Sequence, residues 1–357
     1  MKTNPELCLF STYRNILIAH FSNFLLLLFL IAVPQTSTCQ LVDNSTADDH
    51  ELTIYVIRSV GEMNWESPST LYKSYIKAYT SHIFRKKMSL TGHLFVKLST
   101  PLLEEPLYAG MCTPSRKERR DFVLKQKIGL GVLGASMKAK LEDKNDLIKK
   151  IDYFSRKNEL AFITYHLNQE ATSRIIEFYK VFTSKSQINN IPSDYYGGSL
   201  WPRYENEGAG CSAFGIAILQ IIGVLGEESS SWVRNVNIPM NLIGGKFNKM
   251  HKIKSKMIRR TSCWHNGRGK EEIDFVPFSI YDPSMIYNWI IQQRALPNRL
   301  RTSGYFLTEE SIVPGLSSDR RHVQINAHEP IFIPRTNFNL FIKDYFGKLN
   351  NIQKESQ

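Results

Sequence analysis

The spacing of apolar residues predicts a chain that mixes strands with helices. Segments that alternate apolar with polar residues, or that are rich in β-branched residues, predict strands, because successive side chains of a strand point to opposite faces. These segments are 52–60, 92–98, its hairpin partner 105–111, 159–165 and 330–334. Apolar residues three and four positions apart predict helices, because such residues share one helix face. They occur over 68–84, 169–182 and 281–293, whereas the polar tail after Lys348 is expected to fray.

The most distinctive pattern lies over residues 208–223, where two glycines lead into Cys211 and an almost wholly apolar segment follows. A helix that is apolar on nearly every side is buried rather than amphipathic. Cys211 would lie in the first turn of this helix, where free backbone N–H groups and the positive end of the helix dipole stabilise a thiolate. A buried structural cysteine is the competing interpretation, because free cysteine is among the most buried residue types.

The N-terminal segment predicts a secretory signal peptide over residues 1–38. Basic residues precede the apolar run 21–33, and the small residues 36–38 follow it. The run is shorter than the roughly 20 apolar residues of a membrane span. An uncleaved N-terminal anchor remains the alternative. Lipid attachment at Cys39 is a further alternative, although the residues before Cys39 match a lipoprotein cleavage site poorly. We therefore expect an exported protein that is periplasmic, held in the cell envelope or secreted.

The charge balance favours anionic surroundings. The chain has 45 basic and 33 acidic residues, a formal net charge of +12, and part of the excess lies in the basic run 248–260. Such a balance suits acidic lipid, a cell-wall polymer or nucleic acid. The sequence contains no helix-turn-helix, zinc-knuckle or aromatic-basic motif, so we expect no nucleic-acid partner. The basic run is by default a solvated face, and contact with an anionic membrane or polymer is the alternative.

Several catalytic and cofactor motifs are missing from the sequence. It contains no C-x-x-C, no H-E-x-x-H and no clustered carboxylate loop, so no metal site is expected. It contains no G-x-S-x-G, which argues against a serine hydrolase. The glycines of 129–134 fit the spacing of a dinucleotide-binding loop, but no strong strand precedes them and no βαβ unit follows. We interpret 129–134 as a glycine-rich loop and expect no cofactor.

A thiol nucleophile needs a base to accept its proton and a third group to orient that base. The chain has nine histidines, and most lie in predicted loops, on helix surfaces or in basic surroundings. His93 differs, because it opens a predicted strand directly after a glycine. It is therefore the candidate base for Cys211.

The order of these features resembles the circularly permuted branch of the papain-like NlpC superfamily, in which histidine precedes cysteine. A Gly-His pair at 92–93 opens a strand, and a strand, an Asn-containing turn and a helix follow over 160–182. A loop rich in Tyr and Gly then leads to Cys211 at the head of an apolar helix. The resemblance covers residues 52–226, roughly half of the chain.

The resemblance implies that Cys211 is the nucleophile and His93 the general base. The family carries its third polar residue on the strand after the histidine, where this chain offers Glu105 and Tyr108, and we take Glu105 as the candidate. The implied fold is α+β, with a papain-like core in which a small antiparallel sheet packs against the cysteine-bearing helix, followed by a basic C-terminal extension. The expected segments are a signal peptide over 1–38, the core over 50–226 and the extension over 227–357.

The function implied by the resemblance is that of an exported thiol hydrolase or acyltransferase acting on an amide, thioester or ester. The substrate classes of the family are cell-wall peptides, protein amides and lipids. The alternative is a catalytically silent surface or envelope protein that binds through its basic extension.

The cysteines carry an expectation about redox state. An exported protein meets oxidising conditions, in which cysteines without a reason to stay free tend to pair. Only the thiolate attacks, so Cys211 is expected to remain a free thiol. If a disulfide forms in the mature chain, Cys112 and Cys263 are the candidate pair.

The N-terminus gives a first testable prediction. N-terminal sequencing of the exported protein should find that it begins near Cys39, because a signal peptide is removed after its small-residue stretch. Recovery of an intact Met1 in a membrane-embedded form would show an anchor instead.

Overall fold

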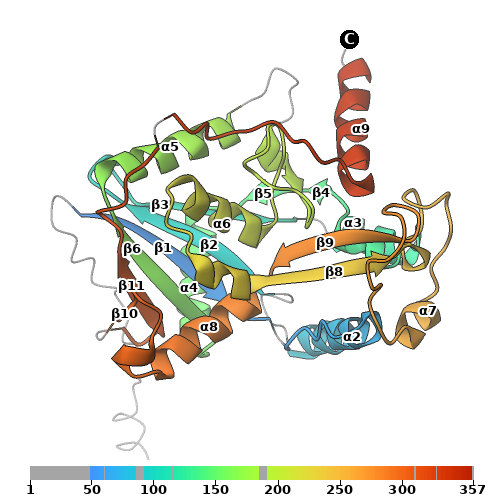
Figure 1. The fold of residues 1–357 in the computed structure, drawn as a ribbon, viewed down its shortest axis with the longest axis horizontal. Coiled ribbons are helices and arrows are strands. Elements are labelled where there is room, and N and C mark those ends of the chain that lie inside the picture. Colours follow the sequence, from blue (N-terminus) through green and yellow to red (C-terminus); the bar gives the residue numbers. More distant parts are fainter. Residues whose placement is uncertain are drawn as a thin grey trace, which may run out of the picture. The chain divides into compact units, whose positions relative to one another are not determined.

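A seven-stranded mixed sheet organises the chain (Figure 1). The structure is a computed structural model that describes residues 49–355, with gaps at 60, 86–91, 115, 185–190, 309–310 and 327. The strand order is β10-β11-β6-β1-β2-β3-β5, and only the pair β11 and β6 is parallel. The strands are β10 (Phe306–Leu307), β11 (Gly315–Asp319), β6 (Leu160–Leu167), β1 (His50–Ile57), β2 (His93–Ser99), β3 (Leu107–Cys112) and β5 (Lys140–Leu141).

Two short ribbons and a set of helices surround this sheet. The ribbons are β4 (Met137–Lys138) with β7 (Tyr195–Tyr196), and β8 (Val233–Pro239) with β9 (Phe275–Tyr281). The helices are α2 (Pro68–Arg85), α3 (Arg116–Leu124), α4 (Lys144–Ser155), α5 (Gln169–Thr183), α6 (Cys211–Ile221), α7 (Ser255–Arg260), α8 (Pro283–Ala295) and α9 (Leu340–Glu355). Within the described residues, no helix has both the length and the hydrophobicity that a membrane crossing requires.

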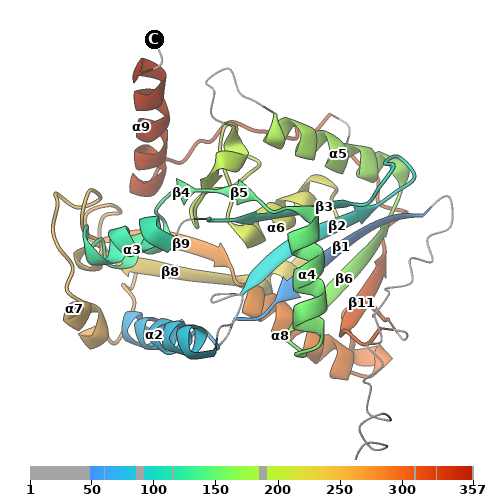
Figure 2. The ribbon, with the colours of Figure 1, turned by 180° about the vertical axis from the view of Figure 1, so that it is seen from behind.

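The central strands are buried on both faces, because helices cover both. On one face the register places Ile54 of β1 beside Val96 of β2 and Ile163 of β6, and α5, α6 and α8 pack over them. On the other face the aromatic rings of Tyr55 and Phe95 stack 5.2 Å apart beneath α4 (Figure 2). Burial on both sides explains why these strands read as nearly continuous apolar runs.

The apolar helix predicted over 208–223 is confirmed as α6, which lies directly on β2 and β3. Gly215 makes this close approach possible, since a Cβ there would lie 2.2 Å from Cδ2 of Leu94. Gly223 follows the helix with a φ of +66°, a left-handed conformation that glycine adopts without strain. The packing of α6 therefore fixes the position of its first residue, Cys211, relative to the first residue of β2, His93.

The residues after 226 belong to the same compact unit as residues 49–226. They supply β11, which pairs with β6, and α8, which packs on β1, β6 and β11. They also supply β8 and β9, whose apolar side chains form a second core with α7 and Phe341 of α9. The segment predicted as a C-terminal extension thus completes the sheet and its core.

The α+β class is confirmed, with two corrections to its details. The sheet is larger than the small antiparallel sheet that we expected, and it is mixed, because the short polar strand β11 adds to it in parallel. The strand predicted over 330–334 is wrong: only Ile333 bridges to Tyr204, since Pro330 and Pro334 have no N–H to donate to a ladder.

The chain end also differs from expectation, because the tail after Lys348, which we expected to fray, continues the helix α9. Its side chains Phe341, Tyr345 and Leu349 recur every four residues and are buried. This spacing places them on one helix face, which packs against the rest of the fold.

The contact between α6 and β2 gives a prediction about stability. Gly215→Ala should lower the free energy of unfolding by about 1–3 kcal/mol, because the added methyl group overpacks the buried Leu94. Gly347→Ala in α9 is the matched control, since a Cβ there meets nothing within 4 Å. It should raise the free energy of unfolding by up to about 1 kcal/mol, the helix-propensity gain alone. Urea denaturation of both variants measures the difference, and equal effects would contradict the proposed packing constraint.

Candidate active site

Cys211 is the first residue of α6, and Gly210 before it has an extended backbone. The first N–H groups of a helix have no carbonyl partner within the helix. In α6 these groups lie at the end that carries the Cys211 thiol. His93 is the first residue of β2 and is only 7% exposed. The structure brings these two residues close enough that His93 interacts with the Cys211 thiol and lowers its pKa.

The surroundings of Cys211 stabilise its thiolate. Burial raises the pKa of the thiol, but the hydrogen bond and charge of His93 oppose this effect. The Tyr196 hydroxyl donates to the Cys211 Sγ at 3.6 Å, and the backbone of Leu94 adds a further hydrogen bond. Together these interactions lower the pKa of Cys211 from 9.0 to about 6. A thiolate of this kind is nucleophilic near neutral pH.

Glu142 is the carboxylate that contacts His93. Its Oε2 accepts from Nε2 of His93, and its Oε1 accepts from the ammonium group of Lys150. Because Nε2 faces Glu142, Nδ1 is the ring nitrogen left for Cys211. Gly110 of β3 makes room for the carboxylate, since a Cβ there would lie 2.7 Å from Glu142 Oε2. The order thiol, imidazole, carboxylate is the arrangement of a nucleophile, its base and the group that orients the base.

The elements that hold Glu142 are short but well anchored. Glu142 follows β5 directly, and its backbone N–H donates to the Gly110 carbonyl at 2.9 Å. The next residue, Asp143, caps α4 by accepting from the Asn145 N–H at 2.8 Å. The carboxylate is thus fixed between the sheet edge and a helix start, and the Glu142 side chain is only 4% exposed.

Glu105, the residue expected in this role, lies elsewhere. Its carboxylate is exposed and accepts from Lys144 at 2.6 Å, which lowers the pKa of Glu105. It lies in the turn between β2 and β3, at the opposite end of β2 from His93. The structure therefore brings together Cys211 and His93 but not Glu105.

A second thiol and a lysine lie close to this group. Burial lowers the pKa of Lys150, while its interactions with Cys112 and Cys211 raise it. Burial raises the pKa of Cys112 at the end of β3, so this thiol is less nucleophilic than Cys211. Cys112, Cys211 and Cys263 are all free thiols, so the candidate pair Cys112 and Cys263 is not bridged in this structure.

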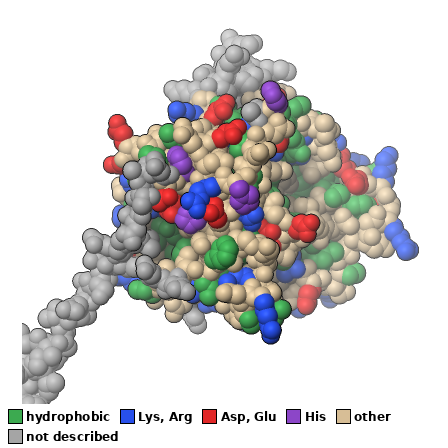
Figure 3. Space-filling model, turned by 60° about the vertical axis from the view of Figure 1, so that its left-hand side comes forward, with side chains coloured by type: hydrophobic (Ala, Val, Ile, Leu, Met, Phe, Trp, Pro, Cys, Tyr) green, Lys and Arg blue, Asp and Glu red, His purple; other side chains and the backbone are tan. Residues whose placement is uncertain are grey.

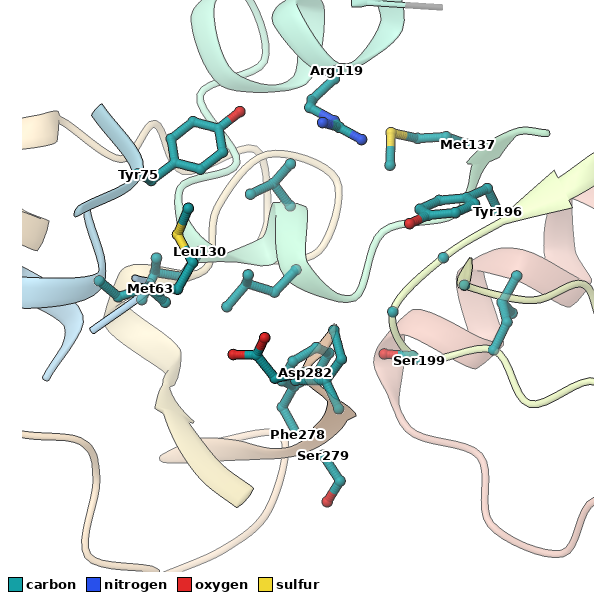
Figure 4. A pocket seen from close by; sticks show the side chains of 18 of the residues that line it. Met63, Tyr75, Arg119, Leu130, Met137, Tyr196, Ser199, Phe278, Ser279 and Asp282 are labelled. Carbon is teal, nitrogen blue, oxygen red and sulfur yellow. The ribbon is translucent and has the colours of Figure 1, made fainter. Parts of the chain in front are cut away.

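A large cavity of about 940 Å³ opens beside Cys211 (Figure 4). Figure 4 shows Met63 and Tyr75 across this cavity from Tyr196. Among the described residues, no group of three or more side chains is arranged to hold a metal ion. The walls come from α2 and the segment before it, from α3, β4, the ribbon β8–β9 and the 3₁₀ turn at Leu130–Leu133. Their apolar side chains include Met63, Tyr75, Leu130, Met137, Phe278 and Ile280.

The glycine-rich segment 129–134 is part of this cavity wall. It forms a 3₁₀ turn over Leu130–Leu133 and contributes to no βαβ unit. Leu130 and Leu133 point toward the ribbon formed by β8 and β9 and share a core with Phe278. Its role in this structure is therefore to line the cavity.

The surface charges follow no single pattern. The basic side chains Lys249, Lys252, Lys254, Lys256, Arg259 and Arg260 are exposed, as expected of the basic run. On the face shown in Figure 3, by contrast, basic, acidic and histidine side chains are interspersed. The N-terminal segment with its predicted signal peptide lies outside the described residues.

Comparisons with protein-family models, with curated proteins and with solved structures find no match for this chain. The inference of function therefore rests on the site itself.

The carboxylates give a prediction about thiol reactivity. Glu142→Gln removes the negative charge beside His93, so the pKa of Cys211 should rise and its alkylation by iodoacetamide should slow several-fold at a pH equal to its pKa of about 6. Glu105→Gln is the matched control and should leave the rate unchanged. In the unchanged protein, labelling should fall as the pH drops below about 6, because the thiolate is then protonated. The opposite ranking of the two variants would assign the orienting role to Glu105.

Proposed function

We propose that this protein is a thiol hydrolase or acyltransferase that acts on an ester, thioester or amide. The observation that carries the proposal is the contact of Cys211 with His93, which in turn contacts Glu142. The lowered pKa of Cys211 supports the same role, because it gives an attacking thiolate.

The chemistry follows from the order of these groups. The Cys211 thiolate attacks the acyl carbon, a C–S bond forms, and the carbonyl oxygen becomes an oxyanion. The oxyanion collapses, the bond to the leaving group breaks, and His93 gives that group a proton. Water or an acceptor hydroxyl or amine then loses a proton to His93 and attacks the thioester. The acyl group leaves as an acid, or as a new ester or amide, and the thiolate and protonated imidazole are restored.

The helix start supplies the oxyanion stabilisation in this scheme. The backbone N–H of Cys211 lies at the N-terminus of α6 and has no carbonyl partner within the helix. The positive end of the helix dipole favours negative charge at the same place. Glu142 keeps the His93 ring oriented and stabilises its charged form, so its contribution acts through the histidine.

The same order of elements supports a permuted papain-like core as part of the proposal. His93 opens β2, and the cysteine follows much later at the head of a buried helix. The third polar residue differs from expectation, because Glu142 directly follows β5, whereas the family carries this residue on the strand after the histidine. Export from the cell belongs to the proposal as well, on the basis of the apolar run 21–33.

The alternative is a catalytically silent protein that binds anionic surfaces. The exposed basic run favours it, because exposed Lys and Arg attract anions. This alternative gives no role to the lowered pKa of Cys211.

The proposal predicts a covalent acyl-enzyme. Incubation with an activated acetyl ester should add one acetyl group to Cys211, visible by peptide mass mapping, because attack precedes hydrolysis. Cys211→Ser should abolish the adduct, and His93→Ala should slow its formation by about a hundredfold or more, the usual contribution of a general base. Cys263→Ser is the control and should change nothing, since Cys263 is exposed and does not line the cavity. Labelling of Cys211 no faster than Cys263 would favour the silent binding protein.

A further inference from the structure

The cavity beside Cys211 has a polar end and an apolar end. At the end near the thiol lie the hydroxyl groups of Tyr196 and Ser199 and the guanidinium of Arg119 (Figure 4). The Ser199 Oγ is buried and has no hydrogen-bond partner among the described residues. Arg119 interacts electrostatically with Tyr196, and no carboxylate among the described residues forms an ion pair with it. Tyr196 already donates to the Cys211 Sγ, so Ser199 and Arg119 are the groups available to a carbonyl or carboxylate oxygen of a ligand.

The opposite end is apolar and leads to the surface. Met63, Tyr75 and Leu130 lie there, and Phe278 lies between them and Tyr196 (Figure 4). The carboxylate of Asp282 lies beside Phe278, but it already accepts from the Trp65 Nε1–H and the Ser284 N–H. At the rim, Ile76 is 39% exposed, although it is a large apolar side chain. Walls of this kind offer few hydrogen-bond partners, so they suit hydrocarbon better than the amide groups of a peptide.

The size of the cavity sets the size of the ligand. Its volume of about 940 Å³ lies near the upper end of the range for ligand sites, roughly 300–1,000 Å³. An acetyl group would leave nearly all of this apolar surface in contact with water. A long hydrocarbon chain would cover it, and burial of hydrocarbon is favourable in proportion to the area removed from water.

We propose that the acyl group taken by Cys211 is a long hydrocarbon chain, which lies in this cavity with its carbonyl at the thiol. The proposal rests on the thiol acyl chemistry of the preceding section for its covalent step. The bond that breaks joins the acyl carbon to its oxygen, sulfur or nitrogen leaving group, and the acyl carbon passes to the Cys211 sulfur. After hydrolysis the product is a fatty acid, whose carboxylate faces Arg119 and Ser199.

A binding experiment on a variant that lacks the Cys211 thiol tests the cavity independently of the acyl-transfer chemistry. Palmitate and acetate are titrated into the Cys211→Ser protein by calorimetry, below the critical micelle concentration. Palmitate should bind and acetate should not, since each buried methylene strengthens binding by about fourfold. Ile76→Asp should weaken palmitate binding at least tenfold by placing a charge on the apolar wall. Ile291→Asp is the matched control, because Ile291 is a similarly exposed isoleucine on α8 outside the cavity, 36% exposed, and should leave binding unchanged.

Turnover of esters separates this inference from the proposed function. Acetyl, octanoyl and palmitoyl esters of one leaving group are compared by kcat/KM, which should rise with chain length. For the palmitoyl ester alone, kcat/KM should fall in Ile76→Asp. Cysteine-dependent turnover with no dependence on chain length, or failure of palmitate to bind, would overturn the hydrocarbon ligand and leave the thiol chemistry standing. Palmitate binding that depends on Ile76, with no turnover of any ester, would keep the ligand and reject the enzyme. Thermal unfolding of both aspartate variants checks that they are folded.

Discussion

The fold depends on the close approach of a buried helix to the strand beneath it. α6 can lie directly on β2 because Gly215 has no side chain to collide with Leu94. Leu94 directly follows His93, and Cys211 lies one turn before Gly215, so the contact that packs the helix also sets the distance between thiol and imidazole. The apolar residues of α6 and of the central strands hold this contact, and they form the largest hydrophobic core of the protein. Chemistry and packing are thus fixed by the same few side chains.

Charge burial is the cost of this arrangement, and the network around Glu142 offsets it. An isolated buried charge is strongly unfavourable, but here a carboxylate lies between an imidazole and an ammonium group. The folded protein lowers the pKa of Cys211, so ionisation of this thiol favours the folded state. That contribution to stability is complete above the ordinary pKa of 9.0 and is lost as the pH falls through about 6. The reactive group therefore also contributes to folding under mildly basic conditions.

Local patterns predicted some of this site, and long-range contacts supplied the rest. The apolar run after Cys211 and the strand after His93 are readable because each is a periodic segment with a clear start. The role of Glu142 could not be predicted in this way, because its contact with His93 joins residues 49 positions apart. The strand before it, β5, has only two residues and so leaves no periodic pattern.

The same limit applies to the sheet as a whole. β11 has the sequence Gly-Leu-Ser-Ser-Asp, with no alternating apolar pattern, and it joins β6 from more than a hundred residues away. The tail after Lys348 was predicted wrongly from its polar composition. Leu349 in this tail continues the helical spacing of Phe341 and Tyr345, so periodicity would have extended α9 into it.

The central claim is that Cys211 is held as a thiolate by His93 and its carboxylate. The most direct measurement is the ultraviolet absorbance of the thiolate as a function of pH, taken as the difference between the unchanged protein and Cys211→Ser. The account predicts that this absorbance persists down to about pH 6 and disappears below it. A titration at the ordinary thiol pKa of 9.0 would show that Cys211 is a structural cysteine and would contradict the account.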